Sequence, residues 1–496
     1  MDDKRKEIGM AIRISGLASG MDTEAMVSDL VKAYKTKGDN YTRNHTKEEW
    51  KQEAWKDLNK KIKAFNSKYI ANMQYSSYYN KRSTQVSDSS KASVIASDGA
   101  TTGTQTLEVK ELAKTAYLTG NKVAATDTGE TLESLGYTGS GKISIEQNGK
   151  IVDFDVTKDT KINEVVSFLQ SSGYNSNYDT KNQRFFVSSK VSGAEADFKL
   201  GGDREALKAL GLSLDDGAVK IDGRDAKIKL NGADFTSKSN NFSINGLTIN
   251  AKNITSEPIS ISTDSDYNGV YDSIKSFITD YNSLIKELDT LYNAPANKGY
   301  NPLTDQEKEV MSDKEVEKWE AKVKEALLRK DSNLASIANA YKNGMLQTYS
   351  INGKSYSLAS LGISTGNYFN TSTEERNVLH IDGDADDPVS SGNTDKLKAA
   401  IAADPEGVTQ FFTQLSKNLY QKLDTMSKSS STRSYGNFYD DKAMTQAVAK
   451  SKTKVDSWDK HVTEIEDRYY KQFNKMETML SKLNSQQSYI SNMFAF

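Results

Sequence analysis

The chain has 496 residues, 36% hydrophobic and 27% charged, so it is long enough for several domains and has the composition of folded, water-facing ones. Its 65 Lys and Arg residues nearly balance 67 Asp and Glu residues, and the net charge of -2 excludes a molecule whose overall charge attracts nucleic acid or another polyanion. The lack of cysteine excludes disulfides, thiolate metal sites and a cysteine nucleophile, and the only histidines (His45, His380 and His461) lie far apart in the sequence, which argues against a histidine-based catalytic or metal site.

The first residues, MDDKRKEIGMAIRISGLASGM, contain no apolar core of the kind found in secretory signals. No stretch of the chain approaches the roughly 18 apolar residues that span a bilayer. We therefore expect a protein that stays in the cytosol or is exported by a system that recognises another signal. We also expect that it does not bind membranes. Residues 1–40 are expected to form a flexible N-terminal segment.

A stalk helix is expected within residues 41–82. The apolar residues that recur at helical spacing there are Trp55, Leu58, Ile62, Phe65 and Tyr69. Upstream, the positions on the same helix face are apolar or aromatic at Val27, Leu30, Tyr34 and Tyr41. The next positions on that face are polar, namely Asn44, Glu48 and Lys51. The apolar seam is therefore expected to lapse before Trp55.

The period then changes from helical spacing to the alternation of β-strands. GKISIEQNGKIVDFDV alternates around Asn148-Gly149, a strong signal for a two-residue hairpin turn, and TLEVKELA, RFFVSS, AKIKLNG and NFSINGLTIN also have strand patterns. One helical stretch, INEVVSFLQSSG, interrupts them. We expect a β-rich domain from residues 83–128 plus 222–268, with a second β-rich head domain, residues 129–221, inserted into it.

Residues 269–460 are expected to form a helical stalk domain. Its first helix carries apolar residues at heptad spacing, namely Val270, Ile274, Phe277, Tyr281, Leu284, Leu288 and Leu291. The expected stalk core combines Ile274, Phe277, Tyr281 and Leu288 with Trp55, Leu58, Ile62 and Phe65. The sequence thus predicts an α+β multidomain protein, with a helical bundle or coiled-coil stalk formed by the N- and C-terminal segments and β-rich domains inserted between them.

Residues 461–496 are expected to form a C-terminal docking helix. From Val455 to Met493 the heptad pattern would extend over ~57 Å as a helix, and Gln472 and Gln486 interrupt its apolar seam. This favours an adaptable contact over a permanent coiled coil. The residues expected at a filament or subunit interface are Val462, Ile465, Tyr469, Met476, Met479, Leu483, Ile490 and Met493.

Motifs that could carry catalysis are incomplete. GYTGSGKIS nearly matches a phosphate-binding loop, but Ile143 stands where Ser or Thr should be. IDGDADD places Asp382, Asp384 and Asp386 at calcium-loop spacing, but Asp387 replaces the required glycine. The carboxylates of DDGAVKIDGRD have no companion nucleophile. We expect no enzyme activity, no cofactor and no metal site.

Several collinear segments resemble the flagellar hook-associated protein 2 family of filament cap proteins. They are AIRISGLASGMDTEAMVSDLV, EEWKQEAWKDLNKKIKAFNSKY, TTGTQTLEVKELAKT, NFSINGLTINAKN, ISISTD, IKSFITDYNSLIKEL, YNPLTDQEKEVMSDKEVEKWEAKVKEALLRKDSNL, LASLGIST and the closing helix. The head, roughly 129–221, matches only loosely, and the residues before Met10 have no counterpart.

The resemblance implies an extracellular protein at the distal tip of the bacterial flagellum, exported through the flagellar channel without a cleaved signal peptide. It implies a homo-oligomeric ring, typically a pentamer, that retains exported flagellin and promotes its folding and polymerisation. The implied partners are flagellin, the distal end of the filament, hook–filament junction proteins and an export chaperone. Under this hypothesis the terminal seam packs against the front of its own chain, neighbouring subunits and the open filament end.

The main alternative is a surface adhesin whose head binds host glycan or mucus, with the stalk as support. A hook–filament junction protein or flagellin itself would share the apolar terminal helices. The segments SGLASGMDTEAMV and NPLTDQEKEVMSDKEVEKWE favour the cap.

Overall fold

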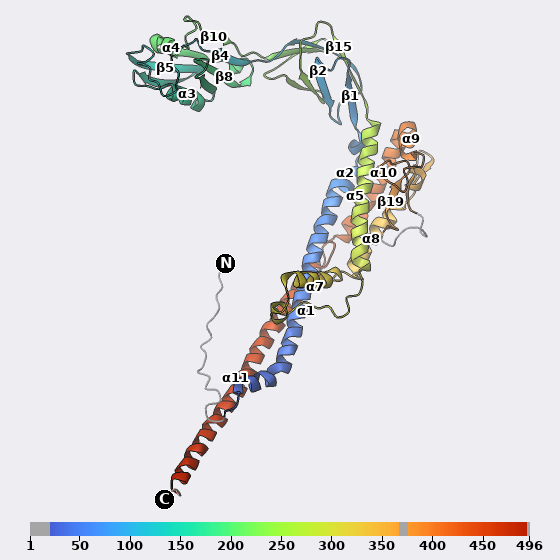
Figure 1. The fold of residues 1–496 in the computed structure, drawn as a ribbon. Coiled ribbons are helices and arrows are strands. Elements are labelled where there is room, and N and C mark those ends of the chain that lie inside the picture. The colour runs from blue at the N-terminus through green and yellow to red at the C-terminus, as the bar shows by residue number, and fades with distance from the viewer. Residues whose placement is uncertain (1–19, 367–374, 494–496) are drawn as a thin grey trace. The chain divides into compact units, whose positions relative to one another are not determined.

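The computed structural model describes residues 20–366 and 375–493 (Figure 1). The chain forms two compact units. One contains Met1–Ser76 and Ser273–Phe496, and the other contains Ser77–Asp272. Helices dominate the first, which we call the helical unit, and strands dominate the second, which we call the β unit. Each unit contains its own buried hydrophobic residues.

The helical unit draws its elements from both ends of the chain. Its long helices are α1 (Thr23–Phe65), α5 (Tyr267–Asn293), α10 (Pro405–Met426) and α11 (Asp441–Met493). The shorter ones are α2 (Ala71–Met73), α6 (Asp305–Glu309), α7 (Asp313–Glu325), α8 (Ser332–Met345) and α9 (Lys396–Ala403), with a π-helical turn η1 (Asn66–Ile70) and a 3₁₀ turn η4 (Ala359–Leu361). Two small hairpins complete it, β16 (Tyr349–Ile351) with β17 (Lys354–Tyr356) and β18 (Ile363–Thr365) with β19 (Leu379–Ile381).

The core of the helical unit joins α1 to α5, α8 and α10. The eight residues expected in the stalk core are all buried: Trp55, Leu58, Ile62, Phe65, Ile274, Phe277, Tyr281 and Leu288. Phe65 lies at the centre of an aromatic cluster, with ring centroids 5.8 Å from Phe277 and 5.7 Å from Tyr341. The hydroxyl of buried Tyr341 donates to Asn66 Oδ1 at 2.6 Å. These contacts fix the last turns of α1 against the rest of the bundle.

The β unit contains two separate hydrophobic cores. The first lies between the sheet β1-β15-β3-β11-β12 and the sheet β13-β14-β2. The bounds of these strands are β1 Arg82–Val86, β2 Ala92–Ala96, β3 Gly103–Glu111, β11 Ala226–Leu230, β12 Ala233–Ser237, β13 Asn241–Ile244, β14 Leu247–Ala251 and β15 Ile259–Ser265, and a 3₁₀ turn η2 (Ser76–Tyr79) precedes β1.

The second core lies in a domain inserted between β3 and β11. It is enclosed by the sheets β10-β4-β8-β7 and β6-β5-β9 with helices α3 and α4. The bounds are β4 Thr115–Thr119, β5 Ser140–Gln147, β6 Lys150–Thr157, α3 Ile162–Ser171, β7 Asn175–Asp179, β8 Arg184–Ser192, η3 Ala194–Ala196, β9 Lys199–Gly202, α4 Arg204–Ala209 and β10 Val219–Ile221.

Asn-Gly turns set the register of the hairpins, as the sequence predicts for Asn148-Gly149. Asn148 has φ 53° and Gly149 has φ 75°, the positive pair that a type I′ turn requires. The turn leaves Gln147 opposite Lys150 and Ser140 opposite Thr157. The structure therefore places Gly141 and Lys142 of the incomplete phosphate-loop motif inside strand β5, where no loop exists to hold a phosphate.

The domain boundaries differ from those expected from the sequence. The inserted domain begins at β4 rather than at residue 129, because Ala116 and Leu118 belong to its core. The segment between β4 and β5, residues 120–139, has no strand pattern, and the boundary expected at residue 129 falls within it. Likewise the helix expected from residue 41 begins at Thr23, and residues 1–19 of the expected flexible segment lie outside the described residues. No helix break separates 269–460 from 461–496, because α11 runs unbroken through residue 461.

Residues 77–272 alone are expected to fold into a soluble domain pair, because the β unit contains both of its cores. A far-ultraviolet circular dichroism spectrum of this fragment should be of the β type, with a cooperative thermal transition. A predominantly helical or an unfolded spectrum would contradict the division into two units.

Candidate functional site

Helices α1 and α11 pair antiparallel along the helical unit, which brings residues from the first and last parts of the described chain side by side (Figure 1). Near its start α1 buries Val27 and Val31 against Ile465 of α11. Further along α1, His45 Nδ1 lies 2.9 Å from Ser451 Oγ, and Gln52 Nε2 donates to Thr445 Oγ1 at 2.9 Å. The pair therefore continues from the first turns of α1 to the base of α11.

Helices α1 and α11 approach closely at Gly38 and Trp458. A Cβ atom at Gly38 would lie 3.1 Å from Trp458 Cδ1, so the absence of a side chain makes room for the indole. The indole Nε1 donates to the backbone carbonyl of Tyr34 at 2.9 Å, and Lys37 Nζ lies 4.4 Å from the ring centroid. The ring thus combines a directed hydrogen bond with a cation–π contact.

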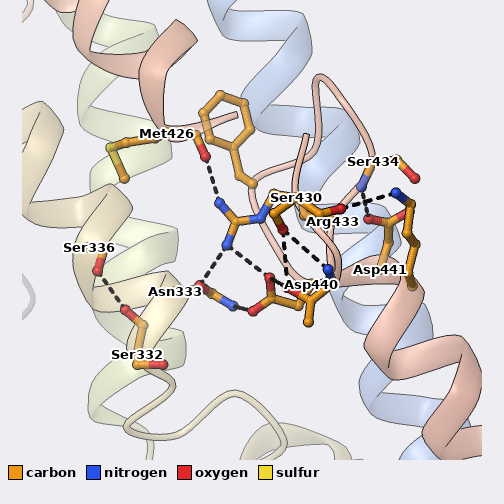
Figure 2. A network of polar contacts seen from close by, with 12 residues as sticks. Ser332, Asn333, Ser336, Met426, Ser430, Arg433, Ser434, Asp440 and Asp441 are labelled. Carbon is orange, nitrogen blue, oxygen red and sulfur yellow. Dashed lines mark hydrogen bonds and ion pairs between the residues drawn. The ribbon is translucent and has the colours of Figure 1, made fainter. Parts of the chain in front are cut away.

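A polar clamp fixes the base of α11. Figure 2 shows Arg433, in the loop before α11, directed at Met426 of α10, at Asn333 of α8 and at Asp440, the residue just before α11. Its Nη1 donates to the carbonyl of Met426 at the end of α10 at 2.6 Å, and its Nη2 donates to Asn333 Oδ1 of α8 at 3.1 Å and to Asp440 Oδ1 at 3.2 Å. Asn333 Nδ2 in turn donates to Asp440 Oδ2 at 3.2 Å. One guanidinium therefore ties the start of α11 to α8 and α10.

The charge of Asp440 strengthens this clamp. Burial opposes ionisation, but hydrogen bonds from Asn333 and Thr432 and the charge of Arg433 outweigh it and lower the pKa of Asp440 below its ordinary value of 3.8. A carboxylate with a lowered pKa in the folded state stabilises that state above the unfolded pKa, and this contribution is lost as the pH falls through the folded pKa. The clamp is therefore intact at neutral pH and weakens in acid.

Beyond its contact with the start of α1, α11 continues as a helix with an exposed apolar stripe. The exposed fractions are 66% for Met479, 58% for Leu483, 53% for Ile490 and 65% for Met493. Polar side chains such as Ser485 and Asn492 occupy the opposite face at helical spacing. We call the exposed residues Met479, Leu483, Ile490 and Met493 the tip stripe.

The structure divides the expected interface residues into two groups. Val462 and Ile465 are instead buried within the chain, where Ile465 packs on Val27 and Val31 of α1. Tyr469 and Met476 are half-buried, and Tyr469 packs against the same cluster. The four residues of the tip stripe are the ones whose apolar surface is free to contact another molecule.

Gly38 and the Arg433 clamp are functional features that the sequence patterns do not predict. A glycine in a helix interior costs about 1 kcal/mol relative to alanine, which signals a close contact at Gly38. Arg433 and Asp440 stand in an irregular loop, and no sequence pattern predicts that their partner is Asn333. Their pairing follows only from the packing of α8 and α10.

The acidic loop 382–387 binds lysines in this structure. Lys275 Nζ lies 2.5 Å from Asp384 Oδ1 and 2.6 Å from Asp386 Oδ2, and Lys396 Nζ lies 3.1 Å from Asp382 Oδ2. Ammonium groups thus neutralise the carboxylates of the incomplete calcium motif.

Within residues 20–366 and 375–493 there is no group of three or more metal-binding side chains. Over the same residues, every helix is too short or too polar to cross a membrane.

Gly38→Leu is expected to separate α1 from α11 locally. The larger side chain would displace Trp458 and cost about 1–3 kcal/mol by overpacking. Amide hydrogen exchange in α11 around Trp458 should accelerate by about tenfold or more, while exchange in the β unit stays unchanged. Gly38→Ala is the control, since it adds one methyl group and a better helix former. Unchanged exchange in Gly38→Leu would contradict the close helix contact.

Comparisons with known proteins match almost the whole chain. Family models described as "Flagellar hook-associated protein 2 N-terminus" and "Flagellar hook-associated protein 2 C-terminus" match residues 19–116 and 223–485. The chain is 23% identical to flagellar hook-associated protein 2 of Halalkalibacterium halodurans, covering 97% of this chain and 100% of that protein. It is 26% identical to the protein of the same name from Thermotoga maritima, covering 74% of this chain and 58% of that one.

Among solved structures, the D1-D2-D3 domains of the flagellar cap protein FliD from Escherichia coli match with a TM-score of 0.48 at 19% identity. The match covers 80% of this chain and 99% of that one.

Proposed function

Since the chain belongs to the flagellar hook-associated protein 2 family, we propose that it caps the distal end of the bacterial flagellar filament. In this role several copies form a ring that retains exported flagellin and promotes its folding and polymerisation at the tip. The protein is a structural component rather than an enzyme, as its family implies. The comparisons do not favour the alternative of an adhesin that binds host glycan or mucus.

The tip stripe is the observation that supports this proposal most directly. A helix that presents Leu483 and Ile490 to solvent, more than half exposed, gains about 1.5–3 kcal/mol for each such side chain that a partner buries. Ordering backbone costs about 1–2 kcal/mol per residue, and an isolated helix end is marginal in water. The end of α11 therefore gains stability by docking on the filament, and it can release again as the cap moves outward.

The helical unit provides the support for this contact. The α1–α11 pair holds α11 as far as Phe473, and the Arg433 clamp fixes its base. A contact surface on a supported helix is presented in a defined direction, which reduces the entropy lost on binding. The buried part of α11 therefore supports the tip stripe rigidly, and the tip stripe contacts the filament.

Deletion of residues 461–496 in the native bacterium tests the proposal. We expect unpolymerised flagellin in the medium and bare or shortened filaments, because the deletion removes the tip stripe together with Val462 and Ile465. A chain that lacks only residues 477–496 keeps those buried contacts and separates loss of docking from loss of the helix pair. Normal filaments without leaked flagellin in both strains would contradict the capping role.

A further inference from the structure

A cleft with a volume of about 620 Å³ lies between helices α8 and α10 of the helical unit. Its floor is apolar, because the buried side chains of Ala340 and Leu419 line it. Gly344 of α8 lies so close to α10 that an added Cβ atom would be 3.0 Å from Leu419 Cδ1. The missing side chain therefore lets the two helices pack closely along the floor of the cleft.

The rim of the cleft is polar and carries a single charge. The exposed residues Asn339 and Asn343 line it on α8, and the exposed residues Asn418 and Lys422 line it on α10. Among the described residues that line the cleft, none is Asp or Glu. The residues three and four positions away from Lys422 along α10 are also uncharged, and in the described part of the chain Lys422 forms no ion pair. The cleft therefore has a net positive charge that no carboxylate of its own balances.

Hydrogen bonds along the rim leave donors available to a ligand. Gln414 Nε2 donates to Asn418 Oδ1 at 3.2 Å, and Asn418 Nδ2 donates to Tyr349 Oη at 3.0 Å. Tyr349 also lines the cleft, and since its oxygen accepts this bond, its own proton is left to donate. Over residues 20–366 and 375–493, the side-chain amides of Asn339 and Asn343 have no hydrogen-bond partner.

Contacts at both ends fix the walls of the cleft. At one end Arg433 donates to the carbonyl of Met426 on α10 and to Asn333 of α8 (Figure 2). At the other end the ring of Tyr349, in β16, packs on Phe411 of α10 with the centroids 5.9 Å apart. The cleft is thus preformed, which lowers the entropy lost when a ligand binds.

The groups around the cleft select a peptide with one carboxylate. A single ammonium group, that of Lys422, balances one carboxylate, whereas a phosphate group carries close to two negative charges. Asparagine amides both donate and accept, so they match the main-chain groups of a peptide. The apolar floor accommodates side-chain methylene groups. Next to the cleft, Leu346 is 72% exposed and offers a contact to an apolar neighbour of the acidic residue.

We infer that the α8–α10 cleft binds an acidic peptide segment of a partner protein. A glutamate or aspartate carboxylate of that segment pairs with Lys422 and accepts a hydrogen bond from Tyr349. Asn339 and Asn343 hydrogen-bond its main chain. This inference goes beyond the proposed capping function and does not depend on it, because the cleft contains no residue of the tip stripe.

Fluorescence anisotropy with a short labelled peptide tests the inference on the full chain. The probe is Gly-Leu-Glu-Ser-Gly with a neutral coumarin label at its amino end and an amide at its carboxyl end, so that the glutamate is its only charge. The comparison peptide has glutamine in place of glutamate. We expect the acidic peptide to bind with a Kd below about 1 mM. The glutamine peptide should bind about tenfold or more weakly, because it lacks the charge-assisted hydrogen bonds.

Three variants of the chain assign the binding to the cleft. Lys422→Gln should weaken binding of the acidic peptide to the level of the glutamine peptide. Tyr349→Phe keeps the ring on Phe411 and should weaken binding about threefold or more, because the hydroxyl donor is lost. Lys417→Gln is the matched control, since Lys417 is an exposed lysine of α10 outside the lining of the cleft, and it should bind like the wild type. An unchanged circular dichroism spectrum shows that each variant is folded.

Other outcomes would overturn the inference. Equal binding of the two peptides, an equal loss in Lys417→Gln and Lys422→Gln, or no binding of the acidic peptide at about 1 mM would each contradict it. Inorganic phosphate that displaces the acidic peptide at the same concentration would replace it with a site for small anions. Self-association of the chain that Lys422→Gln abolishes would replace it with an interface between two copies. None of these outcomes affects the proposed capping function.

Discussion

Leu483→Asp combined with Ile490→Asp is expected to abolish filament capping and to leave the folded chain as stable as the wild type. Both side chains are more than half exposed, so the isolated chain loses no packing. A docked tip stripe would have to bury two carboxylates, at a cost of several kcal/mol each. A loss of about 3 kcal/mol already weakens binding more than 100-fold. Leaked flagellin in the medium and the urea unfolding curve of the purified chain measure the two parts of this prediction.

The control for this variant is Ser485→Asp combined with Asn492→Asp. It introduces the same two charges into the same turns of α11, with the same effect on the helix dipole, but on the opposite face. It should cap normally. If the control variant leaks flagellin as strongly as the stripe variant, charge alone is responsible and the tip stripe is not the contact surface.

Trp55→Ala is expected to be the most destabilising single substitution considered for the helical unit. Trp55 is fully buried, it stacks on Tyr439 with ring centroids 5.4 Å apart, and its Nε1 lies 3.4 Å from Asp331 Oδ2. Removing a buried tryptophan costs about 3–5 kcal/mol. The loss should also free the loop before α11, because Tyr439 would lose the ring against which it stacks.

Chemical denaturation followed by helical ellipticity measures the cost of this substitution. Trp55→Phe serves as the comparison, since it keeps an aromatic ring for the stack and removes the hydrogen bond to Asp331. Trp55→Phe should lower the free energy of unfolding by about 1–2 kcal/mol. This loss is smaller than the one expected for Trp55→Ala. A change below about 1 kcal/mol in Trp55→Ala would contradict the view that this residue anchors α1 in the bundle.

The sequence predicts the elements with strong periodicity well. The heptads around Phe277 and Trp55 mark helices with buried seams, and Asn148-Gly149 marks a hairpin, because these patterns depend on neighbours within a few residues. The sequence predicts the start of α1 too late, at residue 41 instead of Thr23, because burial there depends on residues far away in the sequence. Val27 and Val31 become buried only because Ile465, from the other end of the chain, covers them.

The candidate site could be predicted only in part. A heptad shows which residues of α11 share a face, but not which of them the chain itself covers. The division of that face between Ile465, which packs on α1, and Leu483, which is exposed, follows from where α1 begins. The Arg433 clamp depends on three loop and helix ends meeting in space, and local sequence carries no information about that.

The central claim is that the exposed end of α11 attaches the protein to the filament, and labelling of filament ends tests it most directly. Purified full-length chain carrying a gold label would be incubated with filaments stripped of their caps and viewed by electron microscopy. We predict label at one end of the wild-type filaments, and none at either end when the chain carries Leu483→Asp and Ile490→Asp. Equal labelling of filament ends by both proteins would contradict the account.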